Sequence, residues 1–593
     1  MRAGLFAAPL ACALLLLSSS AAALPARAQN ALREGFRNPP ESARPRVWWH
    51  WMNGNVTKEG IRLDLEWMKR IGIGGADAID ASIDTPQVVK HRLVYMTPGW
   101  KDAFRYAAGL ADKLGLELSI DSSPGWSETG GPWVPPAKAM KKLVWSATSV
   151  SGPFHGVLPR PPDVPGPFGT IRTAATHAPD FYRDSIVIAY RVPPDPPAAT
   201  AVTANTGAID AASLSDGDLT NGALLKPKSP KEEVWINFTY KRPTRFQGVT
   251  LALSTNAGEG VAARIEASAD GVHWRTVANV PPAAQISRFA LAQQTISFPP
   301  VTARHFRLVL RPAPSIPNSL RVVERAPGVI VAAPPPPSGP RVYHVHELVF
   351  HAAATVNEFE KKADFAIARD NYAIDSVPQF APGSAIDPAH VMLLTGMRPD
   401  GRLDWTSPPG HWVVLRMGYS LTGAENHPAT VEATGLEVDK LDASAVRDYI
   451  RHYLDIYKSV TGPALFGAHG LEALTVDSTE IGAQNWTPDM LADFQRLRGY
   501  DPRPWLPALT GAVVRSPTDS DKFLWDFRRT IAQLLATNHY GVIGEVARAE
   551  GLVNYGEALE DRRPSFGDDM EMRQHASNPM GAMWTYVSHT AAT

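Results

Sequence analysis

Several apolar runs of this sequence end on an acidic side chain. One run follows Gly72 and ends at Asp80, and others end at Asp121, Asp477 and Glu557. Two carboxyl groups, one on each side of a glycosidic bond, are the minimum equipment for hydrolysing that bond. The position of these acids at the ends of predicted strands therefore indicates chemistry on a sugar.

Each of these acids also has an ordinary structural explanation. A single Asp at a strand end is as often a helix cap as a catalyst, and Asp477 could cap the turn that follows it. Two arginines follow Glu557 and Glu560 and offer ordinary ion-pair partners. Glu480 lies in the polar loop after Asp477, where nothing local requires a carboxylate. We therefore take Glu480 as the strongest catalytic candidate.

Aromatic and amide side chains accompany the acids. Residues 48–53 read Trp-Trp-His-Trp-Met-Asn, and aromatic rings suit the apolar face of a pyranose while amides and carboxylates suit its hydroxyls. Side chains alternate along a strand, so one face of this run looks toward a ligand and the other packs in the core. The candidate sugar contacts are His50, Trp51, Asn53, Asp80 and Asp121.

The elements that must position these residues alternate between strand and helix over residues 46–122. Thr57 can cap a helix in which Ile61, Leu65 and Met68 recur at helical spacing, and Gly72 ends it. The pattern predicts strands at 47–52, 72–80 and 116–121 and a second helix at 100–114. Such alternation is typical of a parallel sheet with crossover helices.

The rhythm changes after Ser122. Residues 143–350 show short alternating runs and dense proline, which predicts antiparallel β structure inserted into the α/β unit. Its centre, 200–312, has the pattern of one compact sandwich, and Pro-rich stretches at 192–197 and 333–340 bracket it as stiff spacers.

The α/β pattern returns in the last third of the chain, with strands expected at 411–419, 471–477 and 551–557 and helices between them. Arg416 and Tyr419 then join the residues at strand ends. This gives six parallel strands where a closed (β/α)8-type barrel needs eight. We therefore expect a barrel whose last strands are missing, in a chain truncated relative to a longer protein.

Composition removes several classes of function. The formal net charge is −1, so a polybasic nucleic-acid or membrane-surface protein is excluded.

The N-terminus indicates a signal peptide cleaved after Ala28, since it has Arg2, then an apolar run, then Ala26-Arg27-Ala28. We therefore expect a periplasmic or secreted protein with no later membrane-spanning segment. The single cysteine, Cys12, lies in that leader, so disulfides and thiol chemistry are not expected. The sequence contains neither a phosphate-binding loop nor a His-Glu-x-x-His run.

Several long motifs resemble glycoside hydrolase family 106. The matching runs are 48–57, 64–69 with 72–75, Ser123-Pro124-Gly125-Trp126-Ser127 with 130–133, and Gln484-Asn485-Trp486-Thr487 with 498–502. They occur in both predicted barrel parts, roughly 44–145 and 395–590, and add Trp126 and Trp486 to the candidate sugar contacts.

The resemblance implies a calcium-dependent α-L-rhamnosidase that removes terminal rhamnose with inversion, although it identifies no calcium ligands. Glu480 falls where the general acid of the family is expected, and Asp477 beside it would modulate the acid or position water. The general base is expected at the end of a later strand, and Glu557 is the best substitute within this chain. Relatives carry a Glu in a Pro-Met-Gly-Glu-Phe-Trp run, where this chain has Ala582.

The inserted region resembles a discoidin-like or galactose-binding-like sandwich. Its Asp216-Gly217-Asp218 run could hold a calcium ion through oxygen ligands, or could be a simple turn. The expected organisation is a signal peptide at 1–28, a first barrel part at 29–145, a β-rich connection at 146–199, the sandwich at 200–325, a Pro-rich linker and return segment at 326–400, and the second barrel part at 401–593.

Two functions remain open at this point. The first is a secreted rhamnosidase acting on rhamnose-containing glycans or glycosides. The second is a carbohydrate-binding protein without turnover, or an inactive fragment of such an enzyme. Cleavage of an aryl rhamnoside in the presence of calcium favours the first function, and rhamnose binding without release favours the second.

Overall fold

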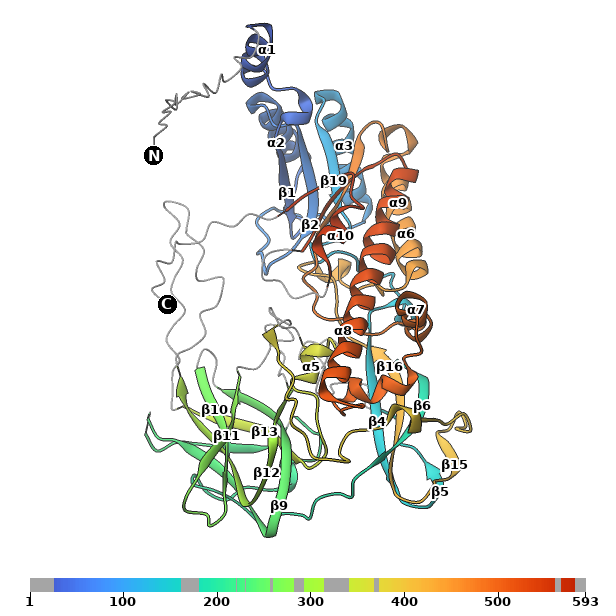
Figure 1. Ribbon diagram of the computed structural model, residues 1–593. Helices are drawn as coiled ribbons and strands as arrows, with labels where there is room; N and C mark the ends of the chain where they lie inside the picture. The colour runs from blue at the N-terminus through green and yellow to red at the C-terminus, as the bar shows by residue number, and fades with distance from the viewer. Residues whose placement is uncertain are drawn as a thin grey trace, which may run out of the picture.

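The computed structural model describes residues 26–161, 181–219, 221–229, 231–255, 260–281, 293–313, 341–366, 373–559 and 567–581. It is a mixed α/β structure in which three larger sheets occupy separate regions (Figure 1). The predicted signal peptide, with Cys12, lies almost entirely outside the described residues. Helix α1 (Ala26–Arg37) begins within this predicted peptide and includes its last three residues.

Six strands form a parallel sheet in the order β1-β2-β3-β17-β18-β19. The bounds are β1 (Arg46–Met52), β2 (Gly75–Ala81), β3 (Glu117–Asp121), β17 (Leu471–Ser478), β18 (Val553–Ala558) and β19 (Asn578–Pro579). Among the described residues, β1 and β19 do not pair with each other, so the sheet is open rather than a closed barrel. The C-terminal ends of all six strands meet at one edge.

Helices cover this sheet on its outer side, and each packs against the next along the surface (Figure 1). They are α2 (Lys58–Ile71), α3 (Pro98–Leu114), α6 (Ala443–Thr461) and α9 (Val542–Ala549). The expected cap of α2 is present, because the Thr57 hydroxyl accepts from Gly60 N. Gly72 ends α2 in the left-handed conformation, with a φ of 89°.

The long helix expected near the end of the chain has three consecutive parts. Helix α8 (Pro517–Leu534) is followed by a π-helical stretch, η10 (Leu535–Gly541), and then by α9. A π-helical turn inside a helix often marks a functional site. Helix α7 (Met490–Arg498) begins after Asp489 and ends at Gly499.

One strand predicted for the barrel belongs instead to a second sheet, with the strand order β14-β6-β16-β4. The strand expected at 411–419 exists as β16 (His411–Leu421), but it pairs antiparallel with β4 (Lys141–Val150) and β6 (Tyr182–Val192). The expectation that it belongs to the parallel sheet is therefore wrong, and β19 is the sixth parallel strand. An apolar run alone does not reveal strand direction, because direction depends on the partner strand.

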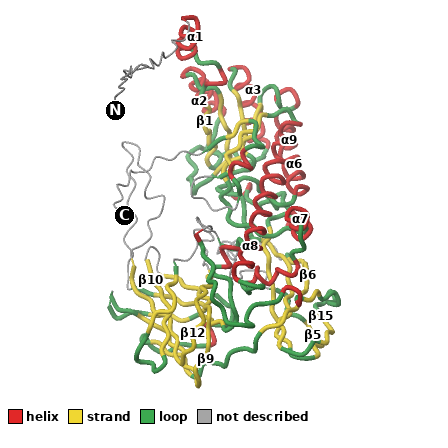
Figure 2. Tube along the Cα trace, viewed as in Figure 1, coloured by secondary structure: helices red, strands yellow, loops and turns green. Residues whose placement is uncertain are grey.

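The third sheet has seven antiparallel strands and its own hydrophobic core (Figure 2). Its longest strands, β9 (Val234–Thr255) and β12 (Gln293–Ala313), pair with each other through two register shifts. The other members are β7 (Ala201–Ala204), β8 (Ala223–Leu225), β10 (Gly260–Ser268), β11 (Arg275–Val280) and β13 (Tyr343–His351). Strand β13 lies within the range predicted as a linker, and β4 begins within the range predicted as the first barrel part.

Short elements complete the described chain. These are β5 (Pro153–Val157), β14 (Met392–Leu393), β15 (Arg402–Thr406), α5 (Phe359–Lys362), α10 (Asp569–Arg573), and the 3-10 turns η1 (Glu41–Ala43), η2 (Pro136–Lys138), η3 (Ala212–Leu214), η6 (Pro388–His390), η7 (Val431–Ala433), η8 (Pro463–Leu465) and η9 (Arg503–Thr510). Within the described ranges, the helices are too short or too polar to cross a bilayer.

Candidate active site

Four carboxyl groups lie on four neighbouring strands of the parallel sheet, and we call them the carboxyl row. They are Asp77 on β2, Asp121 on β3, Asp477 on β17 and Glu557 on β18. All four are buried, with exposures of 2–6%. Asp121 lies opposite Thr475 of β17 in the strand register. Asp121, Asp477 and Glu557 lie at the C-terminal ends of their strands, which parallel strands bring to one edge, whereas Asp77 lies inside β2.

The members of the carboxyl row influence one another's ionisation. Burial raises the pKa of Asp477 to about 9, and a hydrogen bond with Glu557 and the charge of Glu557 contribute. Burial also raises the pKa of Asp121 well above its ordinary value, and the charges of Asp477 and Asp77 raise it further. Because carboxylates this close oppose each other's ionisation, some of them hold protons at neutral pH.

Glu480 follows the row in the loop after β17, as expected from the sequence. Its side chain is half-buried, and the Ser478 hydroxyl donates to Glu480 Oε1 at 3.4 Å. The charge of Glu480 contributes to the raised pKa of Asp477. The structure therefore brings Asp477, Glu480 and Glu557 together at one end of the sheet.

Asp80 lies at the end of β2 and is also buried. The Trp100 indole donates to Asp80 Oδ2 at 2.9 Å, and Oδ1 has no hydrogen-bond partner among the described residues. Burial raises the pKa of Asp80 to about 7. The backbone N–H of Gly125 donates to the Asp80 carbonyl at 2.7 Å. This bond ties the loop after β3 to the end of β2.

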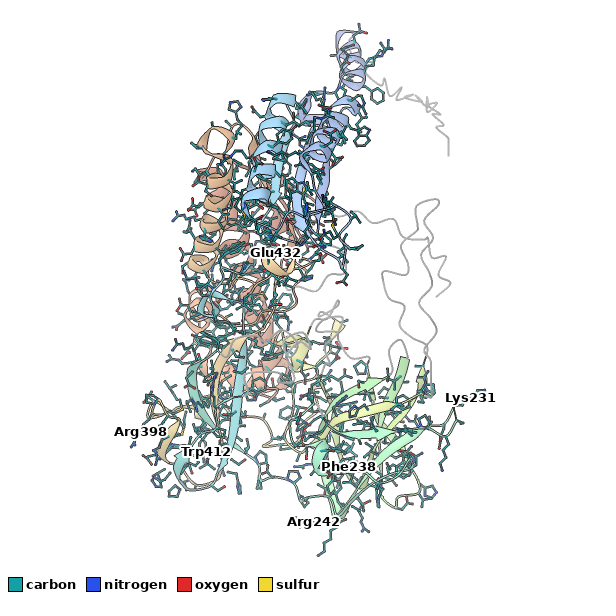
Figure 3. All side chains as sticks on the ribbon, turned by 180° about the vertical axis from the view of Figure 1, so that it is seen from behind. Lys231, Phe238, Arg242, Arg398, Trp412 and Glu432 are labelled. Atoms are coloured by element: carbon teal, nitrogen blue, oxygen red, sulfur yellow. The ribbon has the colours of Figure 1, made fainter. Side chains whose placement is uncertain are left out.

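His50 and Trp126 form an aromatic pair at the same end of the sheet. Their ring centroids are 5.5 Å apart in an edge-to-face arrangement, and both side chains are accessible to solvent. Asn53 lies nearby with its amide donating to the Thr85 carbonyl at 2.7 Å and accepting from Arg92 at 3.3 Å. Arg92 in turn pairs with Glu432 at 2.8 Å, and Figure 3 shows Glu432 beside the parallel sheet, far from Trp412 of β16.

Two of the expected aromatic contacts lie in the core instead. Trp51 is 2% exposed and packs against Trp100 and Phe104. Trp486 is fully buried and contacts Phe527 of α8. Side-chain alternation along β1 turns His50 outward and Trp51 inward. The structure does not support a direct sugar contact by either tryptophan.

Arg416 and Tyr419 are also absent from the site, because β16 belongs to the antiparallel sheet. Arg416 Nε donates to Asp184 Oδ1 at 2.7 Å and its guanidinium forms a bidentate ion pair there. Tyr419 lies in the same strand, near Phe181. Glu560 and Ala582 lie outside the described residues.

A buried network beside the carboxyl row was not expected from the sequence. Glu128, in the loop after β3, is fully buried and accepts from Thr479 Oγ1 at 2.7 Å and from the Tyr540 hydroxyl. Lys440 Nζ lies 3.7 Å from Glu128 Oε2 and donates to Glu437 at 2.8 Å. Burial raises the pKa of Glu128 to about 7, against the opposing charge of Lys440.

The criterion that selected Glu480 also applies to Glu128. Both are carboxylates in a polar loop that follows a strand of the parallel sheet. Glu437 and Lys440 carry a weaker signal, opposite charges three residues apart in the run Leu-Glu-Val-Asp-Lys-Leu at 436–441. Asp77 has no such signal, since it lies in the middle of β2 rather than at its end.

Three of the non-glycine residues with positive φ lie near the candidate residues. Asn53, Glu128 and Ala558 have φ values of 51°, 101° and 70°, a region that residues with a side chain rarely adopt. Asn53 follows β1, Glu128 lies in the loop after β3, and Ala558 is the last residue of β18. Strained positions of this kind cluster at functional sites.

No set of metal ligands is identified in the described part of the chain. There, no group of three or more His, Cys, Asp or Glu side chains is arranged to hold an ion. In the Asp216-Gly217-Asp218 run, Asp216 accepts from the Asp218 N–H at 2.9 Å and from the Asn221 amide at 3.0 Å, as in a turn. These contacts are those of a turn, and we assign no calcium ligands.

Comparisons with known proteins identify the family and an overall fold that resembles this one. The family model of glycoside hydrolase family 106, described as alpha-L-rhamnosidase, matches residues 37–593. The rhamnosidase from Novosphingobium sp. PP1Y superposes with a TM-score of 0.79 at 46% identity, covering 92% of this chain and 49% of that chain. A Formosa agariphila protein named "Putative beta-glucuronidase" is 26% identical over 523 residues, 88% of this chain and 30% of that protein. The chain thus spans less than half the length of both relatives.

Proposed function

Since the chain belongs to glycoside hydrolase family 106, we propose that it hydrolyses terminal α-L-rhamnosides, with Glu480 donating the proton to the leaving group. One observation supports this most directly. Asp477, Glu480 and Glu557 lie together at the C-terminal ends of β17 and β18, and Asp477 shares a hydrogen bond with Glu557. In sheets of parallel strands, functional side chains gather at this edge.

In this proposal, Asp477 holds a proton at neutral pH. A neutral Asp477 lowers the negative charge around Glu480 and Glu557. Glu480 can then act as the acid while Glu557 acts as the base. Glu557 would be the base that activates water on the opposite face of the sugar. Inversion requires carboxyl groups about 6.5–9.5 Å apart, which leaves room for that water.

The neutrality of rhamnose favours it over a glucuronide as the substrate. A glucuronide carries a carboxylate, which would be repelled by the carboxyl row. Arg92 is near the site but already pairs with Glu432 and donates to Asn53. A neutral deoxy sugar can instead place its ring against Trp126 and its hydroxyls against His50 and Asp80. An aryl glucuronide is therefore expected to be a poor substrate.

The direct test is Glu480→Gln. The variant should lose rhamnoside hydrolysis by about 10²- to 10⁴-fold, the range for removing a general acid, and keep the circular dichroism and melting temperature of the parent. Retained turnover would discard the assignment. Rhamnose binding without any turnover by the parent would favour a non-catalytic carbohydrate-binding protein. Proton NMR of the first product decides the stereochemistry, since inversion gives β-L-rhamnose.

We further propose a calcium requirement, export by cleavage after Ala28, a (β/α)8-type arrangement of the parallel sheet and a galactose-binding-like sandwich for the inserted sheet. The calcium requirement comes from family resemblance, and no step above depends on the ion. Dialysis against EDTA, followed by addition of calcium or magnesium, tests it by turnover and melting temperature. N-terminal sequencing of the exported protein tests the cleavage site.

A further inference from the structure

The side chain of Glu128 connects three strand ends of the candidate site. It lies in the loop after β3 and is fully buried. Its φ of 101° places the backbone where a residue with a Cβ is strained. A buried acid on a strained backbone destabilises the fold unless its contacts compensate, so these contacts indicate what the residue does.

One carboxylate oxygen of Glu128 accepts hydrogen bonds from two hydroxyl groups. Thr479 Oγ1 donates to Oε1 at 2.7 Å, and the Tyr540 hydroxyl donates to the same atom. Thr479 is the residue between Ser478, at the end of β17, and Glu480. The contact therefore fixes the backbone at the position immediately before the proposed acid.

Tyr540 and Thr479 also contact the end of β18. Tyr540 OH lies 3.2 Å from the Ala558 carbonyl, and the backbone N–H of Thr479 donates to that carbonyl at 3.0 Å. Ala558 follows Glu557 and has a φ of 70°. Glu128 thus fixes, through one oxygen, the residues adjacent to both Glu480 and Glu557.

The π-helical stretch explains how Tyr540 reaches this point. Tyr540 is 4% exposed and lies in η10, where the long helix widens by a π turn between α8 and α9. The neighbouring His539 is fully buried, with Nε2 2.9 Å from Thr129 Oγ1. Consecutive residues of one helical stretch therefore both contact the loop that carries Glu128.

The other carboxylate oxygen faces a cation. Lys440 Nζ is 3.7 Å from Glu128 Oε2 and also donates to Thr129 Oγ1 at 2.7 Å. Lys440 and Glu437 come from the segment between β16 and α6, and Glu437 accepts from Ser127 Oγ at 2.7 Å. This side of the network holds the Glu128 loop against that segment.

We propose that Glu128 is a positioning residue that sets the separation of Glu480 and Glu557 and does not itself touch the sugar. The proposal rests on the function proposed above and deepens it. A misplacement of about 1 Å in a catalytic group can reduce a rate by about 10²-fold. The Glu128 carboxylate is therefore expected to matter for turnover far more than for substrate binding.

The test compares Glu128→Ala, Glu128→Gln, Thr479→Val and Tyr540→Phe. The first should reduce kcat on an alkyl rhamnoside by about 10- to 100-fold with little change in KM. Thr479→Val and Tyr540→Phe remove one hydroxyl each at nearly constant shape and should give smaller losses of the same kind. Glu128→Gln keeps an acceptor oxygen and should restore part of the activity.

Leaving-group dependence separates positioning from general damage. A dinitrophenyl rhamnoside needs little protonation of its leaving group, so Glu128→Ala should impair it less than the alkyl rhamnoside. A larger loss on the alkyl rhamnoside reports displacement of Glu480, and an equal loss on both substrates reports displacement of Glu557. Losses no larger than those of the control variant would overturn the proposal.

The matched control is Glu360→Gln, because Glu360 is another buried acid with a similar environment. It is 1% exposed, accepts from Thr295 N at 3.0 Å and from Thr295 Oγ1 at 2.7 Å, and burial raises its pKa to about 7. Glu360 lies beside the seven-strand sheet, so this variant should lose stability without a selective loss of turnover.

Hydrogen–deuterium exchange provides a readout that is independent of activity. In Glu128→Ala, amides of residues 478–484 and 555–559 should exchange faster than in the parent, while Glu360→Gln should leave them unchanged. If the parent hydrolyses no rhamnoside, the proposed function fails. The exchange measurement then decides alone whether Glu128 fixes the two segments, and unchanged exchange would refute that role.

Discussion

Acidic side chains behave in opposite ways in the parallel sheet and in the seven-strand sheet. In the seven-strand sheet, Glu233 and Glu266 pair with the Arg264 guanidinium at 2.8 and 2.7 Å. Hydrogen bonds from Arg264 hold the pKa of Glu233 below its usual value. In the parallel sheet, Asp121 and Asp477 are buried against other carboxyls, and their pKa values rise.

The difference separates acids that build the fold from acids that do chemistry. Pairing with arginine at a partly exposed position costs little and helps to fix cross-strand neighbours. Burying acids together costs stability, and natural proteins retain such arrangements mainly at functional sites. Glu347 of β13 and Glu360 do not follow this division, since burial raises the pKa of each to about 7 outside the candidate site.

Replacing Asp477 by Asn should give the largest contrast between the two regions. The amide mimics the shape of a protonated carboxyl but cannot share a proton with Glu557. Rhamnoside turnover should fall by about 10²-fold, the lower part of the range for acid–base groups, while the melting temperature does not fall. Steady-state kinetics and differential scanning calorimetry measure both quantities, with Glu266→Gln as the control that keeps turnover. A normal rate in Asp477→Asn would remove the proposed link between this carboxyl and the chemistry.

The pH dependence of stability should have opposite signs in the two regions. Burial raises the pKa of Asp80 from 3.8 to about 7. As pH rises between these values, the unfolded chain releases a proton that the folded chain keeps, so the free energy of unfolding falls. Asp80→Asn should remove this loss, and its melting temperature relative to the parent should rise from pH 4 to 8. The free energy of unfolding that the parent loses over this pH range amounts to a few kcal/mol, on the order of 1.4 kcal/mol per unit of pKa.

Glu233→Gln provides the opposite case for the same measurement. Its lowered pKa means that its contribution is present above the ordinary value for Glu and is lost as pH falls through the folded value. The stability difference between parent and variant should therefore shrink on acidification. The same slope for Asp80→Asn and Glu233→Gln would show that the two regions do not differ in this respect.

Arg264→Ala should have the smallest effect and should act on stability alone. The substitution removes the cation that pairs with both Glu233 and Glu266, and Glu266 keeps its contact with Arg307 at 2.6 Å. A loss of about 1–2 kcal/mol is expected for the two pairs together, since the Glu233 pair is largely exposed and contributes little. Urea denaturation measures that loss, and kcat on a rhamnoside should equal that of the parent. A selective loss of turnover would connect the seven-strand sheet to the chemistry.

Much of the parallel sheet could be predicted from local signals. Thr57 and Gly72 mark the ends of α2, and its buried positions follow helical spacing, because caps and periodicity depend on neighbouring residues only. Strand β16 was placed in the wrong sheet, since its direction depends on β4, which lies far away in the chain. Local pattern could not supply that information.

The candidate site shows the same limit. Asp80, Asp121, Asp477 and Glu557 were expected at strand ends and Glu480 in the loop after β17, and the structure has them there, because strand ends can be read from the sequence. The side of β1 that faces the core could not be read from a run of aromatic residues, so Trp51 was chosen with His50. Glu128 met the same criterion as Glu480, a carboxylate in a polar loop after a strand, but its partners Thr479 and Tyr540 could not be read from the sequence, because they lie 351 and 412 residues away.

The pairing of β4 with β16 bears on how the chain reaches this structure. Ser119 of β3 and Thr475 of β17 are hydrogen-bonded neighbours separated by 356 residues. Closing a flexible loop of that length costs about 5 kcal/mol in chain entropy by logarithmic scaling. Because β4 and β16 pair along most of their length, an intervening region that folds first delivers both ends of the gap side by side. Folding of the region between β4 and β16 would then be the slow step that precedes formation of the parallel sheet. Substitutions that weaken the pairing of β4 with β16 should therefore slow the refolding of the strand ends that carry the carboxyl row.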